Sequence, residues 1–501
     1  MFHKEKARSF LAVSDEFALG ELPTEKSHPK TIDLSNWSKS DLDHALEVIK
    51  EIEMNLLNVV LEKENEVSEF TNYVQEALSS GGRVFLCGCG ATGRLALALE
   101  TIWNKKGLQK GRVISFMAGG DVALIHSIER FEDHPEYGER QLKELGFTKS
   151  DLLIAITEGG ETPFVIGAVN AASKISNISP YFVYCNPDDV LSRAVVRSKE
   201  VLQNSKIRKL NLSVGEMALA GSTRMQASTI QMLAIGRALF NFDRDWVLKH
   251  KNKLEIIDFN KLKSFIENES EVYHSNGGVI YSTCDLLGIS VLTDTTERSP
   301  TFSLMPFERN INCVPTSYSL CYLSLFQSGE VKDAWRRMLG REPRSLEWSE
   351  TKELTGIERV YGFDISSENI ERRKSYCLKE QHLFNVNYLG ENLNFQFKGL
   401  EAVIELSGHD LLSVHLILKV LLNTHSTLVM GRLGRYENNI MTWVRPSNNK
   451  LIDRTIRYIL ILLNDKGISK SYEEVCFKLF EEMEDMKPDD SLVLKTLKGL
   501  L

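Results

Sequence analysis

The feature that most constrains this chain is the segment 82–95, GRVFLCGCGATGRL. A short apolar run at 84–86 leads into a glycine-rich segment at 88–93, and a helical pattern begins directly after it. This order predicts a buried strand, a tight turn and a helix N-terminus. Glycines let backbone N–H groups approach a ligand closely, and a helix N-terminus adds positive potential. Such a turn favours an anion, most often a phosphate.

The glycine spacing does not identify the ligand by itself, because it also occurs in dinucleotide-binding turns and in βα turns that bind nothing. Two observations argue against a dinucleotide. No acidic residue stands in a persuasive ribose-binding position after a second strand, and Thr92 adds a hydroxyl group that suits a phosphate monoester. We therefore expect Gly88, Gly90, Thr92 and Gly93 to bind a phosphate group.

Length and charge narrow the class of protein. A chain of 501 residues is too long for one hydrophobic core, so two or three domains are expected. The net charge of −8 argues against nucleic acid as the main partner. No apolar run is long enough to span a membrane, and the N-terminus lacks the apolar segment of a secretory leader. We therefore expect no membrane partner and no export. The eight cysteines are scattered without a CxxC pair, so we expect reduced thiols in a cytoplasmic protein, with no metal and no cofactor.

Strands and helices alternate in the first half of the chain, which predicts a parallel sheet covered on both faces. A polar, irregular arm precedes one long amphipathic helix at 41–78. The strands expected after it are 84–86, 113–117, 152–157 and 181–185, and the expected helices are 95–103, 122–131, 163–173 and 222–242.

The same rhythm restarts after a charged helical stretch at 259–274, so the second half resembles a diverged copy of the first. A polar, loop-rich insertion is expected at 328–355, and the end of the chain, from 448, reads as helical throughout. The strands expected here are 279–282, 311–314, 359–363 and 402–406, and the expected helices are 286–295 and 411–425.

Several segments carry motifs that occur together in one family. The turn segment 88–95 fits G-x-G-[TA]-[ST]-G-R-[LM], and 118–120 with 128–133 fits the blocks A-G-G and E-G-x-E-D. Residues 221–225 fit G-S-[ST]-R-[LM], and 22–31 fit an N-terminal arm. On these motifs the chain resembles the sugar-isomerase (SIS) family along nearly its whole length. Within that family it is similar to the N-acetylmuramic acid 6-phosphate etherases and to the glucokinase regulatory protein.

The second half carries the motif parts that the first half lacks. Residues 294–302 fit the family block D-x-x-E-x-x-P-T-[YF], whose glutamate is Glu297, whereas Ile102 stands there in the first half. Residues 419–427 fit K-x-x-L-N-x-x-S-T, which begins at Lys419. In the turn at 283–288, in contrast, Asp285 stands at a glycine position and Leu287 at the position of the hydroxyl group, so we expect this turn not to hold a phosphate.

The resemblance implies an α/β fold of two SIS-type units, flavodoxin-like with parallel sheets, arranged as a monomeric pseudo-dimer with a C-terminal helical cap. The expected parts are an N-terminal arm 1–40, a first SIS domain 41–250, a second, diverged SIS domain 251–445 and the cap 446–501. Because each half is incomplete, we expect one composite site between the units. The resemblance implies that its catalytic residues are Glu129 and Glu297, and that its substrate- and phosphate-binding residues are Gly88, Gly90, Thr92, Gly93, Thr162, Ser222, Thr223 and Lys419.

The activity that the resemblance implies is a lyase reaction on a sugar phosphate in cell-wall sugar recycling. Elimination of a lactyl ether needs a base that takes a carbon-bound proton and an acid that protonates the leaving oxygen, and two carboxyl groups can do both. Without the resemblance, Glu129 and Glu297 would be interpreted as surface carboxylates, and Lys419 as a lysine whose ammonium group reaches solvent from an apolar helix.

One departure from the etherase pattern keeps a second interpretation open. The second phosphate turn of the etherases, S-G-R-T-P, has Gly159 and Glu161 in place of its serine and arginine. Acidic side chains beside a phosphate, Glu158 included, disfavour binding unless they point away. The alternative is a non-catalytic, sugar-phosphate-responsive regulator with a sugar kinase as its partner. A simple sugar isomerase is a third, weaker hypothesis.

Overall fold

The computed structural model describes residues 2–17, 19–128, 131–311, 314–377, 379–446, 448–487 and 490–501. Its first sheet has five parallel strands in the order β2-β1-β3-β4-β5. This is the doubly wound, flavodoxin-like order, in which ligands bind at the carboxyl ends of the strands, where the order reverses. The strands are β1 (Val84–Gly88), β2 (Val113–Met117), β3 (Leu152–Ile156), β4 (Tyr181–Tyr184) and β5 (Arg208–Asn211).

The first four strands lie where the sequence predicts them, and the fifth was not predicted. The helix expected at 122–131 is wrong, because Asp121–Leu124 forms only a 3-10 turn after two glycines with positive φ. The next helix begins at Pro135, a residue that suits the first helical position. The single helix expected at 41–78 is divided at Lys63. The helices of this unit are α3 (Leu42–Glu62), α4 (Glu64–Ser79), α5 (Ala91–Lys105), α6 (Pro135–Glu144), α7 (Pro163–Ile175), α8 (Asp188–Ala194), α9 (Val196–Gln203), α10 (Gln226–Phe240) and α11 (Arg244–Ile256).

The second sheet also has five strands, but only three of them are parallel. Its order is β10-β9-β8-β6-β7, in which β7, β6 and β8 are parallel and β9 and β10 continue as an antiparallel meander. The two-residue turns at 390–391 and 398–399 have positive φ at both residues, which suits tight hairpins. The strands are β6 (Gly278–Thr283), β7 (Cys321–Leu325), β8 (Gln381–Leu389), β9 (Asn392–Phe397) and β10 (Leu400–Glu405).

Two strands expected in this half are wrong. The segment 359–363 lies in the short helix α16 (Ile357–Val360) and the turn after it. The strand expected at 311–314 is replaced by β7, which starts at Cys321, and residues 312 and 313 lie outside the described residues. Short apolar runs do not reveal their own secondary structure, since strands and buried helix segments look alike over four or five residues.

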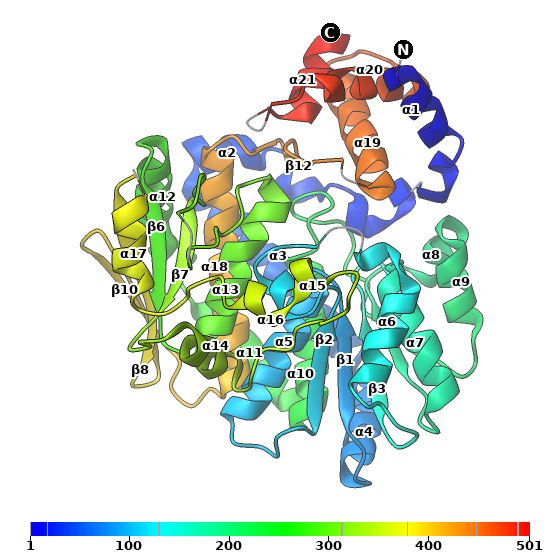
Figure 1. Ribbon diagram of the computed structural model, residues 1–501, viewed down its shortest axis with the longest axis vertical. Coiled ribbons are helices and arrows are strands. Elements are labelled where there is room, and N and C mark those ends of the chain that lie inside the picture. Colours follow the sequence, from blue (N-terminus) through cyan, green and yellow to red (C-terminus); the bar gives the residue numbers. More distant parts are fainter. Residues whose placement is uncertain are drawn as a thin grey trace.

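A layer of helices joins the two sheets (Figure 1). The first unit contributes α5 and α10, and the second contributes α13 (Gly288–Phe302) and α18 (Leu411–Arg432). Helices α5 and α18 each contact the other three. By length and composition α18 could cross a membrane, but 94% of its most apolar window is buried inside the protein. It is the central helix of the core that the two units share.

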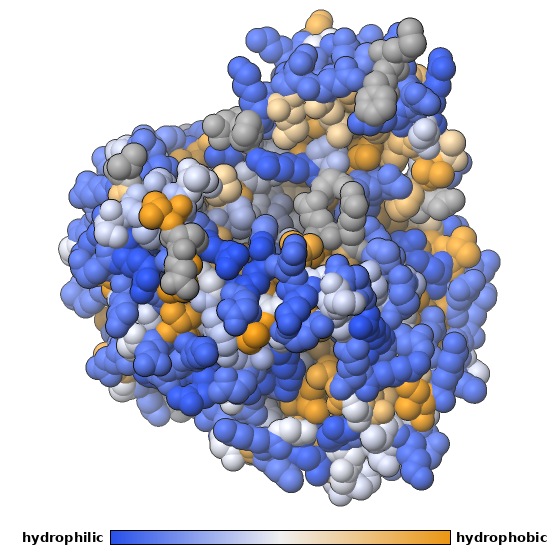
Figure 2. All heavy atoms as spheres, viewed as in Figure 1, coloured by the Kyte–Doolittle hydropathy of each residue, from blue (hydrophilic) through white to orange (hydrophobic). Residues whose placement is uncertain are grey.

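The two ends of the chain meet in a helical cap above the sheets (Figure 1). The C-terminal helices α19 (Asn449–Asp465), α20 (Tyr472–Glu484) and α21 (Leu492–Leu500) pack together, and α1 (Phe2–Leu11) packs against α20. The N-terminal arm is therefore more ordered than the sequence suggests. It contains α1, several 3-10 turns and α2 (Leu34–Ser40). On the face shown in Figure 2, hydrophobic residues form only small patches among hydrophilic ones.

The insertion at 328–355 is a strap that ties the second unit to the first. It begins with α14 (Val331–Leu339) and then crosses to Glu100 on α5. Arg341 and Arg344 pair with the Glu100 carboxylate at 3.0 and 2.7 Å, and Arg341 also pairs with Asp121 at 2.6 Å. Burial would raise the pKa of Glu100, but the two guanidinium groups lower it to about 2.

Glu100→Gln should therefore destabilise the protein at pH 7 by about 3 kcal/mol, because it leaves two largely buried guanidinium groups short of a partner. Since the folded pKa lies below the ordinary value, the stabilisation is present above about pH 4.5 and is lost as the pH falls towards 2. Urea unfolding of both proteins at pH 7 and pH 3.5 should show the difference shrinking at the lower pH. Glu139→Gln, which breaks an exposed pair with Lys143 on α6, is the matched control and should change stability little.

Candidate functional site

A cavity of about 420 Å³ lies at the carboxyl ends of the first sheet's strands. Its walls come from the turn after β1, the end of β2 and the loop at 158–162 that follows β3. Loop 221–224, helix α13 of the second unit, the N-terminal arm and the cap complete it. The cavity therefore lies where a sheet of this strand order binds ligands, and all parts of the chain contribute to it.

The turn after β1 is held together by its glycines and by Thr92. A Cβ atom on Gly88 would lie 2.4 Å from the backbone of Thr92 and Gly93, and one on Gly93 would lie 2.5 Å from the Met117 Cβ, so neither position tolerates a side chain. Gly90 has a φ of +55° and caps α5. Of the four turn residues predicted to bind phosphate, Gly90 is the one that lines the cavity.

Thr92 lies elsewhere than the sequence predicts. Its hydroxyl group donates a hydrogen bond to the Cys89 carbonyl at 2.8 Å and accepts one from the Cys89 N–H at 2.9 Å. Thr92 is only 1% exposed and does not line the cavity. Threonine hydroxyls commonly bond to nearby backbone in this way at the start of a helix. Thr92 therefore shapes the turn and presents no hydroxyl group to the cavity.

Loop 221–224 brings polar groups to the opposite wall. Ser222 and Thr223 both line the cavity, and the buried Ser222 hydroxyl has no hydrogen-bond partner among the described residues. Gly221 has a φ of +69°, and a Cβ atom there would lie 2.3 Å from the Tyr458 hydroxyl oxygen. Thr162, from the loop after β3, also lines the cavity, and its hydroxyl oxygen lies 3.1 Å from that of Thr157.

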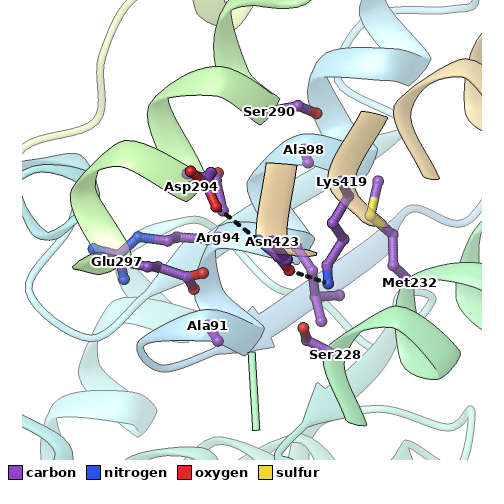
Figure 3. Close-up of a pocket in the computed structure, with 12 residues that line it drawn as sticks. Ala91, Arg94, Ala98, Ser228, Met232, Ser290, Asp294, Glu297, Lys419 and Asn423 are labelled. Carbon is purple, nitrogen blue, oxygen red and sulfur yellow. Dashed lines mark hydrogen bonds between the residues drawn. The ribbon is translucent and has the colours of Figure 1, made fainter. Parts of the chain in front are cut away.

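Glu297 reaches this cavity from α13 of the second unit. It is 5% exposed, and no cation among the described residues forms an ion pair with it within 4.0 Å. Burial raises the pKa of Glu297, although the positive charges of Arg94, Arg224 and Lys419 partly oppose this effect. Figure 3 shows Glu297 beside Arg94, at the edge of a smaller cavity of about 20 Å³ that Glu297 also lines.

Lys419 takes a different position from the one predicted. Its ammonium group donates to the Arg224 carbonyl at 2.7 Å, to Thr229 Oγ1 at 2.8 Å and to Asn423 Oδ1 at 3.0 Å. It lines the smaller cavity (Figure 3) and not the large one. Burial lowers the pKa of Lys419 to about 8. The lysine therefore supports loop 221–224 from beneath.

The motif block at 419–427, which begins with Lys419, also binds the side chain of Arg224. The Arg224 guanidinium pairs with Asp294 at 3.3 Å and donates to the hydroxyl groups of Ser426 and Thr427, each at 2.9 Å. Asn423 donates to Asp294 at 3.0 Å. The motif blocks at 294–302 and 419–427 of the second half are thus joined to the loop at 221–225 of the first half by one buried network of hydrogen bonds and an ion pair.

Glu129, the other predicted catalytic residue, lies outside the described residues. Its described neighbours Ser127, Ile128 and Glu132 line the cavity.

The two acidic residues of loop 158–162 differ in charge. Glu161 pairs with Lys450 at 2.6 Å and with Arg197 at 3.1 Å. Burial would raise the pKa of Glu161, but these cations lower it to about 2. Glu158 has no ion pair among the described residues, and burial raises its pKa to about 8. Neither side chain therefore presents an uncompensated negative charge at neutral pH.

The sequence analysis missed several residues of this cavity. Glu25 of the N-terminal arm forms two hydrogen bonds with Arg454 of α19, at 2.6 and 2.8 Å, and both line the cavity. Arg94, Arg224 and Lys450 also line it. Arg94 and Arg224 lie inside the motif blocks at 88–95 and 221–225, which is the signal that could have identified them. Among the described residues, no group of three or more His, Cys, Asp or Glu is placed to hold a metal ion.

The corresponding turn of the second unit is filled by side chains. Asp285 lies 3.5 Å from both Lys105 and Arg337, and Leu287 is fully buried. A Cβ atom on Gly288 would meet Met338 of α14 at 3.0 Å. Lys105 of α5 and Arg337 and Met338 of α14 therefore lie beside this turn.

Comparisons with known proteins identify relatives of this chain. Residues 66–173 match the family described as the glucokinase regulatory protein N-terminal SIS domain. An N-acetylmuramic acid 6-phosphate etherase from Petrotoga mobilis is 30% identical over 219 residues, which cover 43% of this chain and 68% of the relative. One from Vibrio atlanticus is 32% identical over 222 residues, which cover 44% and 67%. The crystal structure of tagatose-6-phosphate ketose/aldose isomerase from Escherichia coli aligns over 80% of this chain and 97% of its own, with 11% identity and a TM-score of 0.43. On the two etherase matches, the chain belongs to the SIS-domain family that includes the N-acetylmuramic acid 6-phosphate etherases.

Proposed function

We propose that this protein binds a sugar 6-phosphate in the 420 Å³ cavity and cleaves the lactyl ether of N-acetylmuramic acid 6-phosphate. The observation that carries the proposal is that Glu297 of the second unit lines the same cavity as the glycine turn of the first. An acid–base group and a phosphate-binding turn thus face a common space.

The phosphate group is held between the turn and loop 221–224. The backbone N–H groups at the start of α5 point towards the cavity end of the helix, where the helix dipole favours an anion. Ser222 and Thr223 supply hydroxyl groups from the facing wall, and Thr162 supplies one from the third side. Thr92 and Lys419 act indirectly in this proposal, since they hold the two loops in place.

Glu297 and Glu129 are the proposed acid–base pair. One takes the carbon-bound proton next to the ether carbon, and the other protonates the lactyl oxygen as the carbon–oxygen bond breaks. A carboxyl group with a raised pKa can hold and release a proton near neutral pH, and burial gives Glu297 this property. Its freedom from a close ion pair leaves both oxygens available to a substrate.

We further propose that the chain is a pseudo-dimer with one surviving site. The helices α5 and α13 each follow the first strand of their sheet, and they contact each other between the sheets. A symmetric dimer of single units has two equivalent turns, whereas here the second turn is filled. Light scattering should therefore give a single-chain mass for a protein that binds one phosphate ligand; binding of two ligands per chain would contradict this proposal.

Glu297→Gln should abolish lactate release, with a loss of about 10²–10⁴-fold, because a positioned acid or base contributes that much. Binding of N-acetylmuramic acid 6-phosphate should change only a few-fold, since the carboxyl group need not touch the phosphate. A coupled lactate assay and calorimetry test the two parts separately. Glu136→Gln, on the exposed side of α6, is the control for the charge change. Turnover retained in Glu297→Gln would refute the assigned role.

Ser222→Ala and Thr92→Val should weaken phosphate binding for different reasons. Ser222→Ala removes the proposed direct hydrogen bond to the phosphate, worth about 1.5 kcal/mol, so the affinity for the sugar phosphate should fall by about tenfold. The melting temperature should stay the same. Thr92→Val removes the hydroxyl group that shapes the turn, so affinity and melting temperature should fall together. Thr92→Ser should restore both. If Ser222→Ala binds as tightly as the wild type, the phosphate does not lie against loop 221–224.

The same measurements separate an enzyme from a regulator. Tight binding of fructose 6-phosphate, no lactate release under conditions where a known etherase works, and inhibition of a sugar kinase in a coupled assay would together replace the lyase proposal.

A further inference from the structure

Glu158 is a buried carboxyl group that the proposed elimination does not use. It lies in the loop after β3, at the carboxyl end of the strand that pairs with β1 and its glycine turn. Its side chain lines the 420 Å³ cavity and is only 9% exposed. The Cys185 N–H donates to the Glu158 carbonyl at 2.9 Å, which fixes the backbone of this loop.

No side chain among the described residues pairs with the Glu158 carboxyl, although its own backbone N–H donates to it. Its Oε1 atom is buried without a hydrogen-bond partner, and Glu158 takes part in no ion pair there. The cations that face it are engaged elsewhere, because Lys450 pairs with Glu161 at 2.6 Å and Lys419 donates to the Arg224 carbonyl at 2.7 Å. An ionised carboxyl group is strongly disfavoured in such a place, so the protonated form is expected.

The charged groups that face Glu158 act in both directions, because Glu297 raises its pKa whereas Lys450 and Lys419 lower it. Glu297 faces it from α13 and adds a negative charge. The thiol groups of Cys89 and Cys185 face it from the ends of β1 and β4, and burial raises the pKa of both. Burial is the main reason that the pKa of Glu158 rises to about 8, and Glu297 adds to it.

We propose that Glu158 is a ligand-contacting residue that remains protonated at neutral pH and donates an O–H hydrogen bond to an oxygen atom of a bound sugar phosphate. This inference rests on the proposed sugar-phosphate function of the cavity. A neutral acid can contact an anionic ligand, whereas its conjugate base repels it. Glu158 therefore makes phosphate binding depend on pH in a range where the ligand itself stays a dianion.

The expected pH dependence has a definite size. If only the protonated form binds, the apparent Kd rises about tenfold between pH 7 and pH 9, because the free group titrates at about pH 8. Glu158→Gln keeps a neutral hydrogen-bond donor at every pH, so its affinity should stay nearly constant over this range. Glu132→Gln removes another carboxyl group that lines the cavity, and it should shift the curve without removing its fall.

The test is calorimetric titration of wild type, Glu158→Gln and Glu132→Gln with two phosphate monoesters, N-acetylglucosamine 6-phosphate and fructose 6-phosphate, at pH 7.0, 8.0 and 9.0. A fall in wild-type affinity that disappears only in Glu158→Gln supports the inference. A fall that persists in Glu158→Gln overturns it, because Lys419, which also titrates near pH 8, would then be the responsible group. Wild-type affinity that is constant across the range overturns it as well.

A measurement without ligand separates this inference from the proposed function. Because the folded pKa of Glu158 lies above its ordinary value, the wild type should lose stability relative to Glu158→Gln as the pH rises from about 4.5 to 8. Melting temperatures of both proteins at pH 5.0, 6.5 and 8.0 test this directly. If neither probe binds at any pH, the sugar-phosphate function and the ligand contact both fail. If the probes bind but the melting temperatures of wild type and Glu158→Gln differ by the same amount at every pH, the proposed protonation of Glu158 fails and the sugar-phosphate function stands.

Discussion

The site of this protein depends on one buried network that crosses the boundary between its two sheets. Lys419 and Asp294 of the second unit hold the carbonyl and the guanidinium of Arg224 in the first. A buried charge without a partner is strongly destabilising, so the Arg224 loop cannot keep its position unless the second unit is docked. The wall that loop 221–224 gives to the cavity therefore depends on contacts from the second unit.

Around that network, charges are balanced almost group by group. Glu161 replaces the arginine of the etherase turn, yet Lys450 of the cap and Arg197 neutralise it. Glu25 of the arm is matched by Arg454 of the cap. The cap and the arm thus bring their own charges into the cavity. Among the described carboxyl groups that line the cavity, Glu297 and Glu158 remain without an ion pair, and both have a raised pKa.

Four strands of the first sheet were predicted well because they are short apolar runs that alternate with helical patterns, and each run is buried on both faces. The fifth, β5, was missed because its sequence RKLN is mostly polar. The second sheet was predicted poorly. Its β8–β10 meander alternates buried and exposed residues and turns on two tight hairpins, so it does not resemble the parallel strands that were expected. The strap at 328–355 looked like a polar loop because its arginines are polar in sequence, although Arg341 and Arg344 are partly buried and pair with the buried Glu100 and Asp121.

The sequence by itself predicted the strand, the glycine-rich turn and the helix at 82–103 and the different turn at 283–288. These are local properties, since glycine spacing and hydroxyl positions act within a few residues. Only the tertiary structure decided what each polar side chain does. Thr92 bonds to its own turn, Lys419 donates to the backbone of loop 221–224, and burial raises the pKa of Glu158. The reason is physical: the role of a buried polar group is set by the partners that surround it, and those partners come from segments far apart in the chain.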